Sequence, residues 1–200
     1  MTGLPVVEVF SDYICPWCYL DTVRTDRLQR EHGVELRWSV FPLHPETPDE
    51  GTELSELFAG REELIKDMQA RLRQVAQAEG LPLAERTRTY NSRRAQELGK
   101  WAEAQGRGEA FRKAVFEAFF AQGCNIALVD ELVRIVEAVG LPGDEARTAL
   151  ADGSFAAAVD ADWQRARELG VTAVPTHLCS GKRVVGFGSY DDLVRLIGKG

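Results

Sequence analysis

Cysteine and long apolar runs are both scarce in this chain of 200 residues. Its four cysteines are too few for a fold that relies on disulfides. No apolar run approaches the roughly 20 residues that a membrane-spanning helix needs. A hydrophobic content of 44% and a charged content of 28% are instead typical of a globular protein with its own core. A close cysteine pair is therefore available for chemistry.

Positive charge is scarce relative to negative charge. The chain has 24 basic and 31 acidic residues, which gives a net charge of -7. This balance argues against binding along a phosphate backbone. The arginine-rich stretches 86–88 and 93–94 have acidic neighbours, so we interpret them as solvated helix faces. We expect neither a nucleic-acid partner nor a membrane partner.

The N-terminal residues lack the pattern of a secretory leader. Residues 1–5 include no basic residue, and Glu8 interrupts the apolar run that follows. These features predict a cytoplasmic protein. In that reducing compartment a close cysteine pair indicates catalysis or metal binding rather than a structural crosslink.

Two separated segments carry strand patterns, and a long helical segment lies between them. Periodicity and turn residues predict strand 6–10, helix 15–32, strand 34–41, strands 176–179 and 183–187, and helix 190–197. Residues 53–170 show helical spacing throughout. Removing that block leaves a β-α-β unit followed by β-β-α, which is the thioredoxin topology.

The predicted fold class is therefore α/β, a thioredoxin-like core with a large α-helical insertion. Residues 1–52 and 171–200 would form the thioredoxin-like domain. Residues 53–170 would form the insertion subdomain.

The motif Cys15-Pro16-Trp17-Cys18 lies just after a predicted strand and at the start of a predicted helix. Thiolate rather than thiol attacks a disulfide. The unpaired N–H groups and partial positive charge of a helix N-terminus favour anionic sulfur. We therefore predict that Cys15 is the exposed nucleophile and that Cys18, one turn inward, resolves the mixed disulfide.

The residues between the two cysteines suit a substrate-contacting surface. Pro16 fits the first helical turn without losing a hydrogen bond. Trp17 is expected to be partly exposed and to touch substrate, the alternative being a packed side chain. A zinc site would need a second close pair of ligands, whereas His177 could add only one. We predict no metal site.

A second motif, Val174-Pro175-Thr176, directly precedes the C-terminal hairpin. In the thioredoxin arrangement a cis-proline at this place faces the cysteine pair. The backbone of Val174 would then be free to pair with an extended substrate. We expect Val174 and Pro175 to contribute to substrate binding.

Several polar residues have two roles open. Glu8 is either a buried proton relay beneath Cys18 or a solvated residue at a sheet edge. Asp12 more plausibly closes the turn before the helix than acts on Cys15 by its charge. His177 is either directed at the active site or a core residue with satisfied hydrogen bonds. Cys179 is expected to be a small buried hydrophobe and Cys124 an incidental cysteine.

Together these motifs resemble the DsbA-like thioredoxin-fold family, and within it the FrnE branch. The resemblance rests on residues 10–20, 41–45, 90–92, 116–120 and 170–176. It implies a thioredoxin domain with an α-helical insertion, dithiol–disulfide exchange through Cys15 and Cys18, and a cis Pro175. His177 and Cys124 depart from the usual pattern of the family.

The leading hypothesis is a thiol–disulfide oxidoreductase that acts on protein or small-molecule thiols and disulfides, without a cofactor other than its own redox-active disulfide.

A second hypothesis is a glutathione-dependent isomerase or transferase. Kappa-class glutathione transferases and 2-hydroxychromene-2-carboxylate isomerases are related to this family, although they typically have serine in place of Cys15. Residues 187–191 resemble their glutathione-binding turn, so glutathione is a candidate co-substrate. A third hypothesis is a non-catalytic metal-binding or chaperone-like protein.

Overall fold

The computed structural model describes residues 4–198. The chain forms two compact units. Met1–Leu43 and Asp162–Gly200 form one, here called the sheet unit, and His44–Ala161 form the other, here called the helical unit. We expected the boundaries after residues 52 and 170. The structure divides the chain earlier at both places, so the second half of helix α8 (Ala156–Glu168) belongs to the sheet unit.

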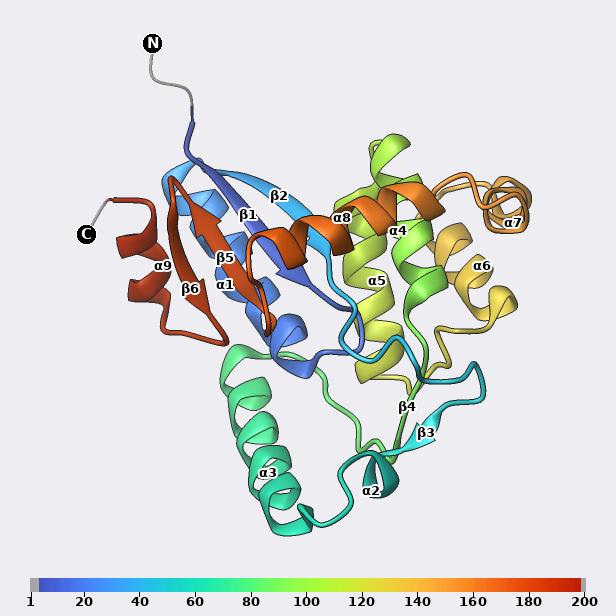
Figure 1. Ribbon diagram of the computed structural model, residues 1–200, viewed down its shortest axis with the longest axis horizontal. Coiled ribbons are helices and arrows are strands. Elements are labelled where there is room, and N and C mark those ends of the chain that lie inside the picture. The colour runs from blue at the N-terminus through green and yellow to red at the C-terminus, as the bar shows by residue number, and fades with distance from the viewer. Residues whose placement is uncertain (1–3, 199–200) are drawn as a thin grey trace. The chain divides into compact units, whose positions relative to one another are not determined.

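The sheet unit has the predicted β-α-β and β-β-α order (Figure 1). Its elements are β1 (Val6–Ser11), α1 (Pro16–His32), β2 (Glu35–Val40), β5 (Thr176–Cys179), β6 (Lys182–Val185) and α9 (Tyr190–Leu196). The four strands form a sheet in the order β2-β1-β5-β6. Strand β1 is parallel to β2 and antiparallel to β5, which is antiparallel to β6. The predicted fold class is confirmed.

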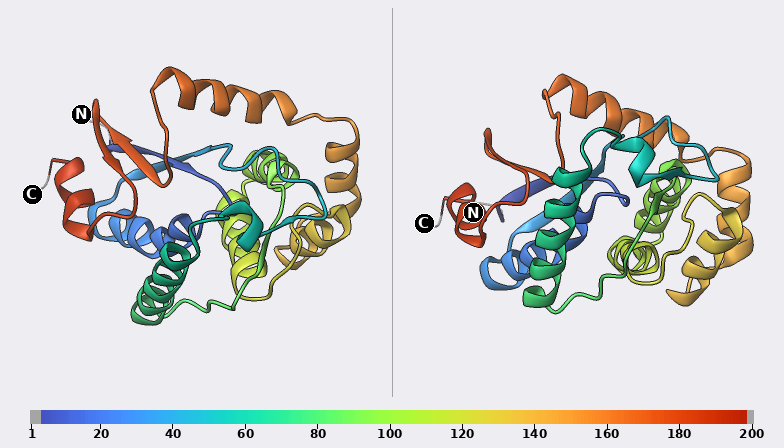
Figure 2. Two further views of the ribbon diagram at one scale, coloured as in Figure 1. Left: turned by 60° about the horizontal axis from the view of Figure 1, so that its bottom comes forward. Right: turned by 90° about the horizontal axis from the view of Figure 1, so that it is seen from below.

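One face of this sheet carries the apolar core of the unit. Successive side chains of a strand point to opposite faces, so Val7 and Val9, both 0% exposed, share one face of β1. They pack in a cluster with Leu28 of α1 and Leu193 of α9. Helices α1 and α9 therefore cover this face, and Figure 2 shows both on the same side of the sheet.

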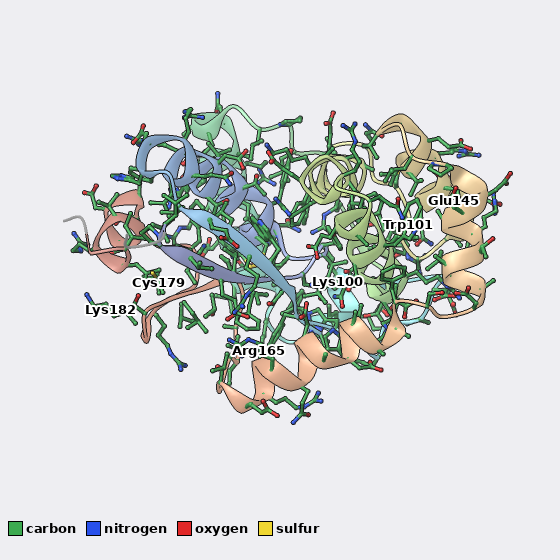
Figure 3. All side chains as sticks on the ribbon, turned by 90° about the horizontal axis from the view of Figure 1, so that it is seen from above. Lys100, Trp101, Glu145, Arg165, Cys179 and Lys182 are labelled. Carbon is green, nitrogen blue, oxygen red and sulfur yellow. The ribbon has the colours of Figure 1, made fainter. Side chains whose placement is uncertain are left out.

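The opposite face carries charged groups. Glu8 projects from β1 between Val7 and Val9, and its carboxylate bonds to Arg165 of α8, which is labelled in Figure 3. Asp162 of the same helix accepts a hydrogen bond of 2.8 Å from the backbone N–H of Val40. These bonds attach the second half of α8 to β1 and β2. They explain why the boundary of the sheet unit lies at Asp162.

The helical unit is not helical throughout, contrary to expectation. Its elements are β3 (Thr52–Glu53), α2 (Leu54–Leu57), α3 (Glu62–Glu79), β4 (Arg88–Thr89), α4 (Arg93–Ala104), α5 (Gly108–Phe120), α6 (Val129–Ala138), α7 (Gly143–Ala151) and the first half of α8. Strands β3 and β4 pair as a short antiparallel ladder. Beside it, a Cβ on Gly51 would lie 2.5 Å from the carbonyl oxygen of Thr89. Glycine therefore permits the close approach of these two segments.

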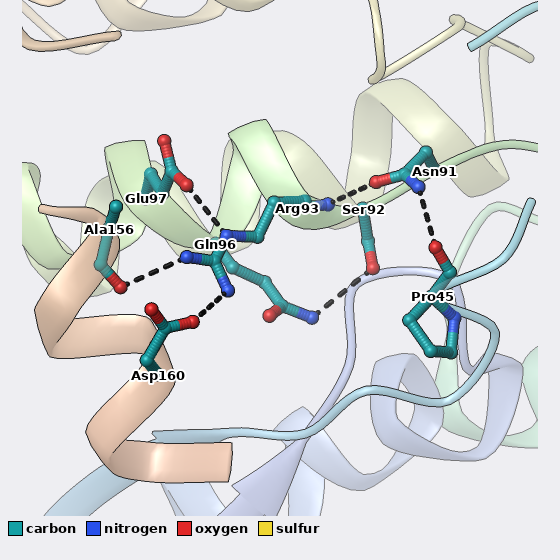
Figure 4. Close-up of polar contacts among 8 residues, drawn as sticks. All are labelled: Pro45, Asn91, Ser92, Arg93, Gln96, Glu97, Ala156 and Asp160. Carbon is teal, nitrogen blue, oxygen red and sulfur yellow. Dashed lines mark hydrogen bonds and ion pairs between the residues drawn. The ribbon is translucent and has the colours of Figure 1, made fainter. Parts of the chain in front are cut away.

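Helices α4 to α7 pack around an aromatic core. Phe111, Phe116, Phe119 and Phe120 of α5 are all buried, and the last two rings meet edge to face at 4.8 Å. Figure 4 shows a polar connection between α4 and α8, where Arg93 of α4 bonds to Asp160 and to the carbonyl of Ala156. These bonds hold the first half of α8 against α4. Among residues 4–198, none of the helices has both the length and the apolar character needed to cross a bilayer.

Candidate active site

The Cys15-Pro16-Trp17-Cys18 motif lies where strand β1 gives way to helix α1. Cys15 is the N-cap of α1, with an extended backbone (φ -85°, ψ 114°), and Pro16 is the first helical residue. The carbonyl oxygen of Cys15 accepts hydrogen bonds from the N–H groups of Cys18 and Tyr19, at 3.1 and 3.2 Å. The sequence folds this way because proline favours the first position of a helix and lacks an N–H to satisfy there.

Asp12 closes the turn before this helix. Its backbone carbonyl accepts a 3.0 Å hydrogen bond from the N–H of Cys15. Its carboxylate accepts hydrogen bonds from the N–H groups of Ile14 and Leu43. The turn-closing role predicted for Asp12 is confirmed, because these bonds fix the backbone that presents Cys15.

The sulfur of Cys15 faces the loop before β5. Its thiol donates to the carbonyl oxygen of Val174 over 3.5 Å, and the Val174–Pro175 peptide bond is cis. Three predicted site residues from distant parts of the sequence therefore meet here. The expectation that Cys15 is exposed is wrong: the residue is only 3% exposed, because its side chain is turned toward this loop rather than toward solvent.

Cys18 lies deeper, at 1% exposure. Burial raises the pKa of its thiol well above the usual value, and the neighbouring Cys15 raises it further, against smaller opposing contributions from Ser11 and Asp12. Both cysteines are free thiols in this structure. Cys18 is therefore protonated at neutral pH, and it must lose that proton before it can attack a disulfide.

Trp17 projects from the first turn of α1 and is partly exposed. Its ring lies 5.4 Å from that of Phe187, measured between centroids. The guanidinium of Arg24 lies 3.7 Å from the centroid of the Phe187 ring and donates to the carbonyl of Gly188. We did not predict a role for Arg24. Its spacing of seven residues from Trp17, two turns along one helix face, was the available signal.

Glu8 corresponds to neither of its two predicted roles. It is 4% exposed, so the interpretation as a solvated residue is wrong. Burial by itself would raise the pKa of this carboxyl, but hydrogen bonds from Arg165, Arg37 and Ser39 outweigh burial and lower the pKa to about 2. So acidic a group is a poor proton acceptor at neutral pH. The contacts of Glu8 therefore favour a structural clamp over a relay.

His177 is a fully buried residue on β5. Its Nε2 lies 2.7 Å from a carboxylate oxygen of Asp21, whose residue exposure is 1%. Its other ring nitrogen, Nδ1, has no hydrogen-bond partner among the residues that the structure describes. We had not singled out Asp21. The available signal was an acidic residue on the buried face of α1, one turn beyond Cys18.

The remaining cysteines lie outside this site. Cys179 is 4% exposed and packs in the core cluster of the sheet unit, as predicted. Cys124 lies between α5 and α6, where partial burial and the nearby Glu131 raise the pKa of its thiol. Within residues 4–198, histidine, cysteine and acidic side chains do not gather in groups of three or more that could hold a metal ion.

Comparison with known proteins agrees with this fold. A family model described as the DSBA-like thioredoxin domain matches residues 6–198. The chain therefore belongs to the DSBA-like thioredoxin family. Among curated proteins it is similar to YwbO of Bacillus subtilis, with 25% identity over 92% of each chain.

Solved structures with the same fold include enzymes of more than one activity. A probable DsbA oxidoreductase, SCO1869 from Streptomyces coelicolor, shares 28% identity at a TM-score of 0.88, over 98% of this chain and 91% of the other. A 2-hydroxychromene-2-carboxylate isomerase shares 22% identity at 0.78, over 96% and 93%. The cytosolic disulfide reductase DsbM from Pseudomonas aeruginosa, solved with GSH, shares 20% at 0.70, over 96% and 97%. The fold is consistent with a thiol–disulfide oxidoreductase or an isomerase.

Proposed function

We propose that this protein is a dithiol–disulfide oxidoreductase of the FrnE branch, exchanging disulfides with protein or small-molecule thiols through Cys15 and Cys18. The observation that carries the proposal is the 3.5 Å contact between the Cys15 thiol and the carbonyl of Val174, directly before cis Pro175. This contact supports the proposal because it brings the Cys15 thiol, at a helix N-terminus, next to the backbone segment proposed to bind substrate. The thiol of Cys18 lies one turn away.

The exchange proceeds in two displacements. The Cys15 thiolate attacks one sulfur of a substrate disulfide, and the other substrate sulfur leaves as a thiolate. Cys18 then loses its proton and attacks Cys15 Sγ, which breaks the mixed disulfide and releases the second substrate thiolate. The substrate gains two electrons and the protein retains a Cys15–Cys18 disulfide. The reverse sequence oxidises a substrate dithiol.

Four residues around Cys15 are proposed to contact substrate. Pro16 and Trp17 are partly exposed at the start of α1. Val174 and Pro175 precede β5, whose pairing with β1 begins at Thr176. An extended substrate segment could pair with the backbone of Val174 as an added strand. The side chain of Trp17 would then pack beside it.

Glutathione is proposed as a co-substrate that reacts through sulfur at Cys15, and the compartment proposed is the cytoplasm. DsbM, described as cytosolic and solved with GSH, supports both ideas. The predicted glutathione-binding turn at residues 187–191 receives less support. Ser189 and Asp192 form a reciprocal capping box at the start of α9. The Asp192 carboxylate accepts the N–H of Ser189, and the Ser189 hydroxyl accepts the N–H of Asp192. A second carboxylate would meet that negative charge.

Two cysteine variants test the proposal. Cys15→Ser should abolish reduction of insulin, whereas Cys18→Ser should accumulate a mixed disulfide with substrate on Cys15, identified by peptide mapping. Cys124→Ser is the matched control, because it removes a partly exposed thiol outside the site and should retain full activity. Full activity in Cys15→Ser would refute the proposal.

Calorimetry with glutathione on folded Cys15→Ser tests the competing hypothesis of a glutathione-dependent isomerase. That activity requires tight binding of glutathione without the sulfur of Cys15.

A further inference from the structure

His177 and Asp21 form a hydrogen-bonded pair buried in the sheet unit. His177 is 0% exposed and Asp21 is 1% exposed. The 2.7 Å bond joins Nε2 of the ring to the carboxylate, whereas Nδ1 has no partner within residues 4–198. Buried polar atoms without a hydrogen bond are costly and rare in native proteins. Such an atom therefore calls for a physical explanation.

The surroundings of the ring are apolar on the neighbouring strands. The residues paired with His177 are Val9 on β1 and Val184 on β6. Helix α9 contributes Leu193 and Leu196 to the core on this side of the sheet. Its charged residues Asp191 and Arg195 are exposed, and the half-buried Asp192 bonds to Ser189 and Arg195. Asp21 is the charged group that α1 directs at the ring. The ring is therefore paired with apolar residues on both neighbouring strands, and Asp21 is its bonded charged partner.

The pair lies between the two segments that carry the dithiol site. Asp21 follows Cys18 by three residues on α1, a spacing that puts both side chains on one helix face. His177 follows Pro175 by two residues on β5, beyond the Val174 carbonyl that contacts Cys15. It is fixed opposite Val9 on β1, the strand that leads into Cys15. The pair therefore joins α1, three residues beyond Cys18, to β5, two residues beyond Pro175.

The chemistry of this pair suits proton uptake. A carboxylate at Nε2 fixes the neutral imidazole with its proton on that nitrogen, leaving the lone pair on Nδ1. A proton taken up at Nδ1 creates an imidazolium beside the carboxylate. The bond from Nε2 to the carboxylate is then a charge-assisted hydrogen bond. Asp21 therefore positions the ring.

The proposed reaction needs such a group. The thiol of Cys18 is buried and must lose a proton in the second displacement, where bulk water has little access to it. Two other carboxylates are buried in the sheet unit. Glu8 has a pKa of about 2 and is held by two arginines, so it does not accept a proton at neutral pH. The carboxylate of Asp12 already accepts hydrogen bonds from the N–H groups of Ile14 and Leu43. The open nitrogen of His177 has the appropriate chemistry.

We propose that His177 Nδ1, positioned by Asp21, is the internal acceptor of the Cys18 proton during resolution of the mixed disulfide. The proton moves from Cys18 Sγ to Nδ1, a bond forms between the sulfurs of Cys18 and Cys15, and the substrate leaves as a thiolate with the electron pair of the broken disulfide. In the reverse reaction the imidazolium returns the proton to Cys18. This inference rests on the proposed dithiol exchange.

The test follows the two displacements separately. Reduced protein is mixed by stopped flow with one equivalent of an aromatic disulfide whose thiolate is coloured, in a Cys124→Ser background that removes the partly exposed thiol. The first phase reports attack by Cys15 and the second reports resolution by Cys18. With an internal acceptor, the second-phase rate should be nearly constant from neutral to alkaline pH. Without one it should rise in proportion to hydroxide, and that result would overturn the proposal.

Variants then assign the acceptor. His177→Asn and Asp21→Asn should leave the first phase unchanged, slow the second by roughly 100-fold at neutral pH, the scale of general base catalysis, and make its rate depend on hydroxide. Thr25→Val is the control. It alters a fully buried residue of the same helix whose hydroxyl bonds only to α1 carbonyls within the described chain, and it should change neither phase.

The outcomes separate this inference from the proposed function. A wild-type protein without a first phase contradicts dithiol exchange itself. Folded variants of His177 and Asp21 with an unchanged second phase contradict only the proton acceptor, as does an equal loss in Thr25→Val. If neither variant folds, the pH profile of the unaltered site decides the question.

Discussion

The sheet unit buries the carboxylates of Glu8, Asp12 and Asp21. Those of Glu8 and Asp21 lie on opposite faces of one sheet, and their surroundings differ. The carboxylate of Glu8 bonds to Arg37, Arg165 and Ser39. Asp21 bonds to a single imidazole whose second nitrogen has no partner in residues 4–198. Both residues are more than nine-tenths buried. Burial is therefore not what distinguishes them.

The difference lies in how completely each charge is compensated. Glu8 has more positive charge around it than its own negative charge, so it stays ionised at neutral pH, and its contacts attach α8 to the sheet. The pair of Asp21 and His177 can exist with or without an added proton. A buried group with a fixed charge suits a structural role, whereas one that can change its charge suits proton transfer. Four predictions test this contrast, beginning with the largest effect.

Replacing the pair by apolar residues should separate activity from stability. In Asp21→Leu with His177→Phe, we expect resolution to slow by roughly 100-fold while the free energy of unfolding stays equal or increases, since apolar residues often replace a buried ion pair without loss. Urea unfolding and the two-phase thiolate assay measure the two quantities. A double variant that is destabilised yet resolves the mixed disulfide at the wild-type rate would mean that the pair is structural and does not transfer a proton.

Glu8→Gln should show the opposite behaviour. The neutral amide leaves two guanidinium groups without their carboxylate, and we expect a loss of roughly 2 kcal/mol in the free energy of unfolding. This loss is at the low end of the range for breaking a buried ion pair because Arg165 and Arg37 are 46% and 55% exposed, so solvent screens their charges. Both kinetic phases should remain unchanged. A slowed second phase in this variant would restore Glu8 as the relay.

The contribution of Glu8 should also depend on pH in a defined direction. Its carboxyl has a pKa of about 2 in the folded protein against an ordinary value of 4.5. The stabilisation is therefore complete above the unfolded value and is lost as pH falls toward the folded one. The difference in unfolding free energy between wild type and Glu8→Gln should shrink below pH 4.5 and nearly vanish near the folded pKa. A difference that grows on acidification would contradict the assigned contacts.

The smallest expected effect is that of Ser39→Ala. The hydroxyl of Ser39 donates one of several hydrogen bonds to Glu8, at 3.0 Å. Its removal should cost about 1 kcal/mol and raise the pKa of Glu8 slightly, because both arginines remain. Chemical denaturation measures the first quantity and carbon-detected NMR titration the second. A loss as large as that in Glu8→Gln would mean that the arginines contribute little.

Much of the sheet unit could be predicted from local patterns. Alternating and apolar runs located β1 and β2, and Gly33, with φ of 64°, ends α1 as expected. The place of the cysteine pair at the start of α1 followed from the same patterns. These features depend on residues close together in the sequence, which is why periodicity and turn chemistry suffice.

Features made by distant residues could not be predicted in the same way. The bond between His177 and Asp21 joins residues 156 positions apart, and that between Glu8 and Arg165 joins residues 157 apart. The low exposure of Cys15 likewise depends on a loop 159 residues away. Helix α8 has one continuous helical pattern, so its sequence gave no sign that its second half belongs to the sheet unit.

The central claim is that Cys15 and Cys18 exchange between dithiol and disulfide. Its most direct test is to equilibrate the protein across a series of glutathione redox buffers, block free thiols, and map the disulfides by mass spectrometry. The account predicts a reversible Cys15–Cys18 disulfide, with Cys179 and Cys124 outside the pair. Persistence of both thiols in the most oxidising buffer, or a disulfide that joins either cysteine to a different partner in the chain, would contradict it.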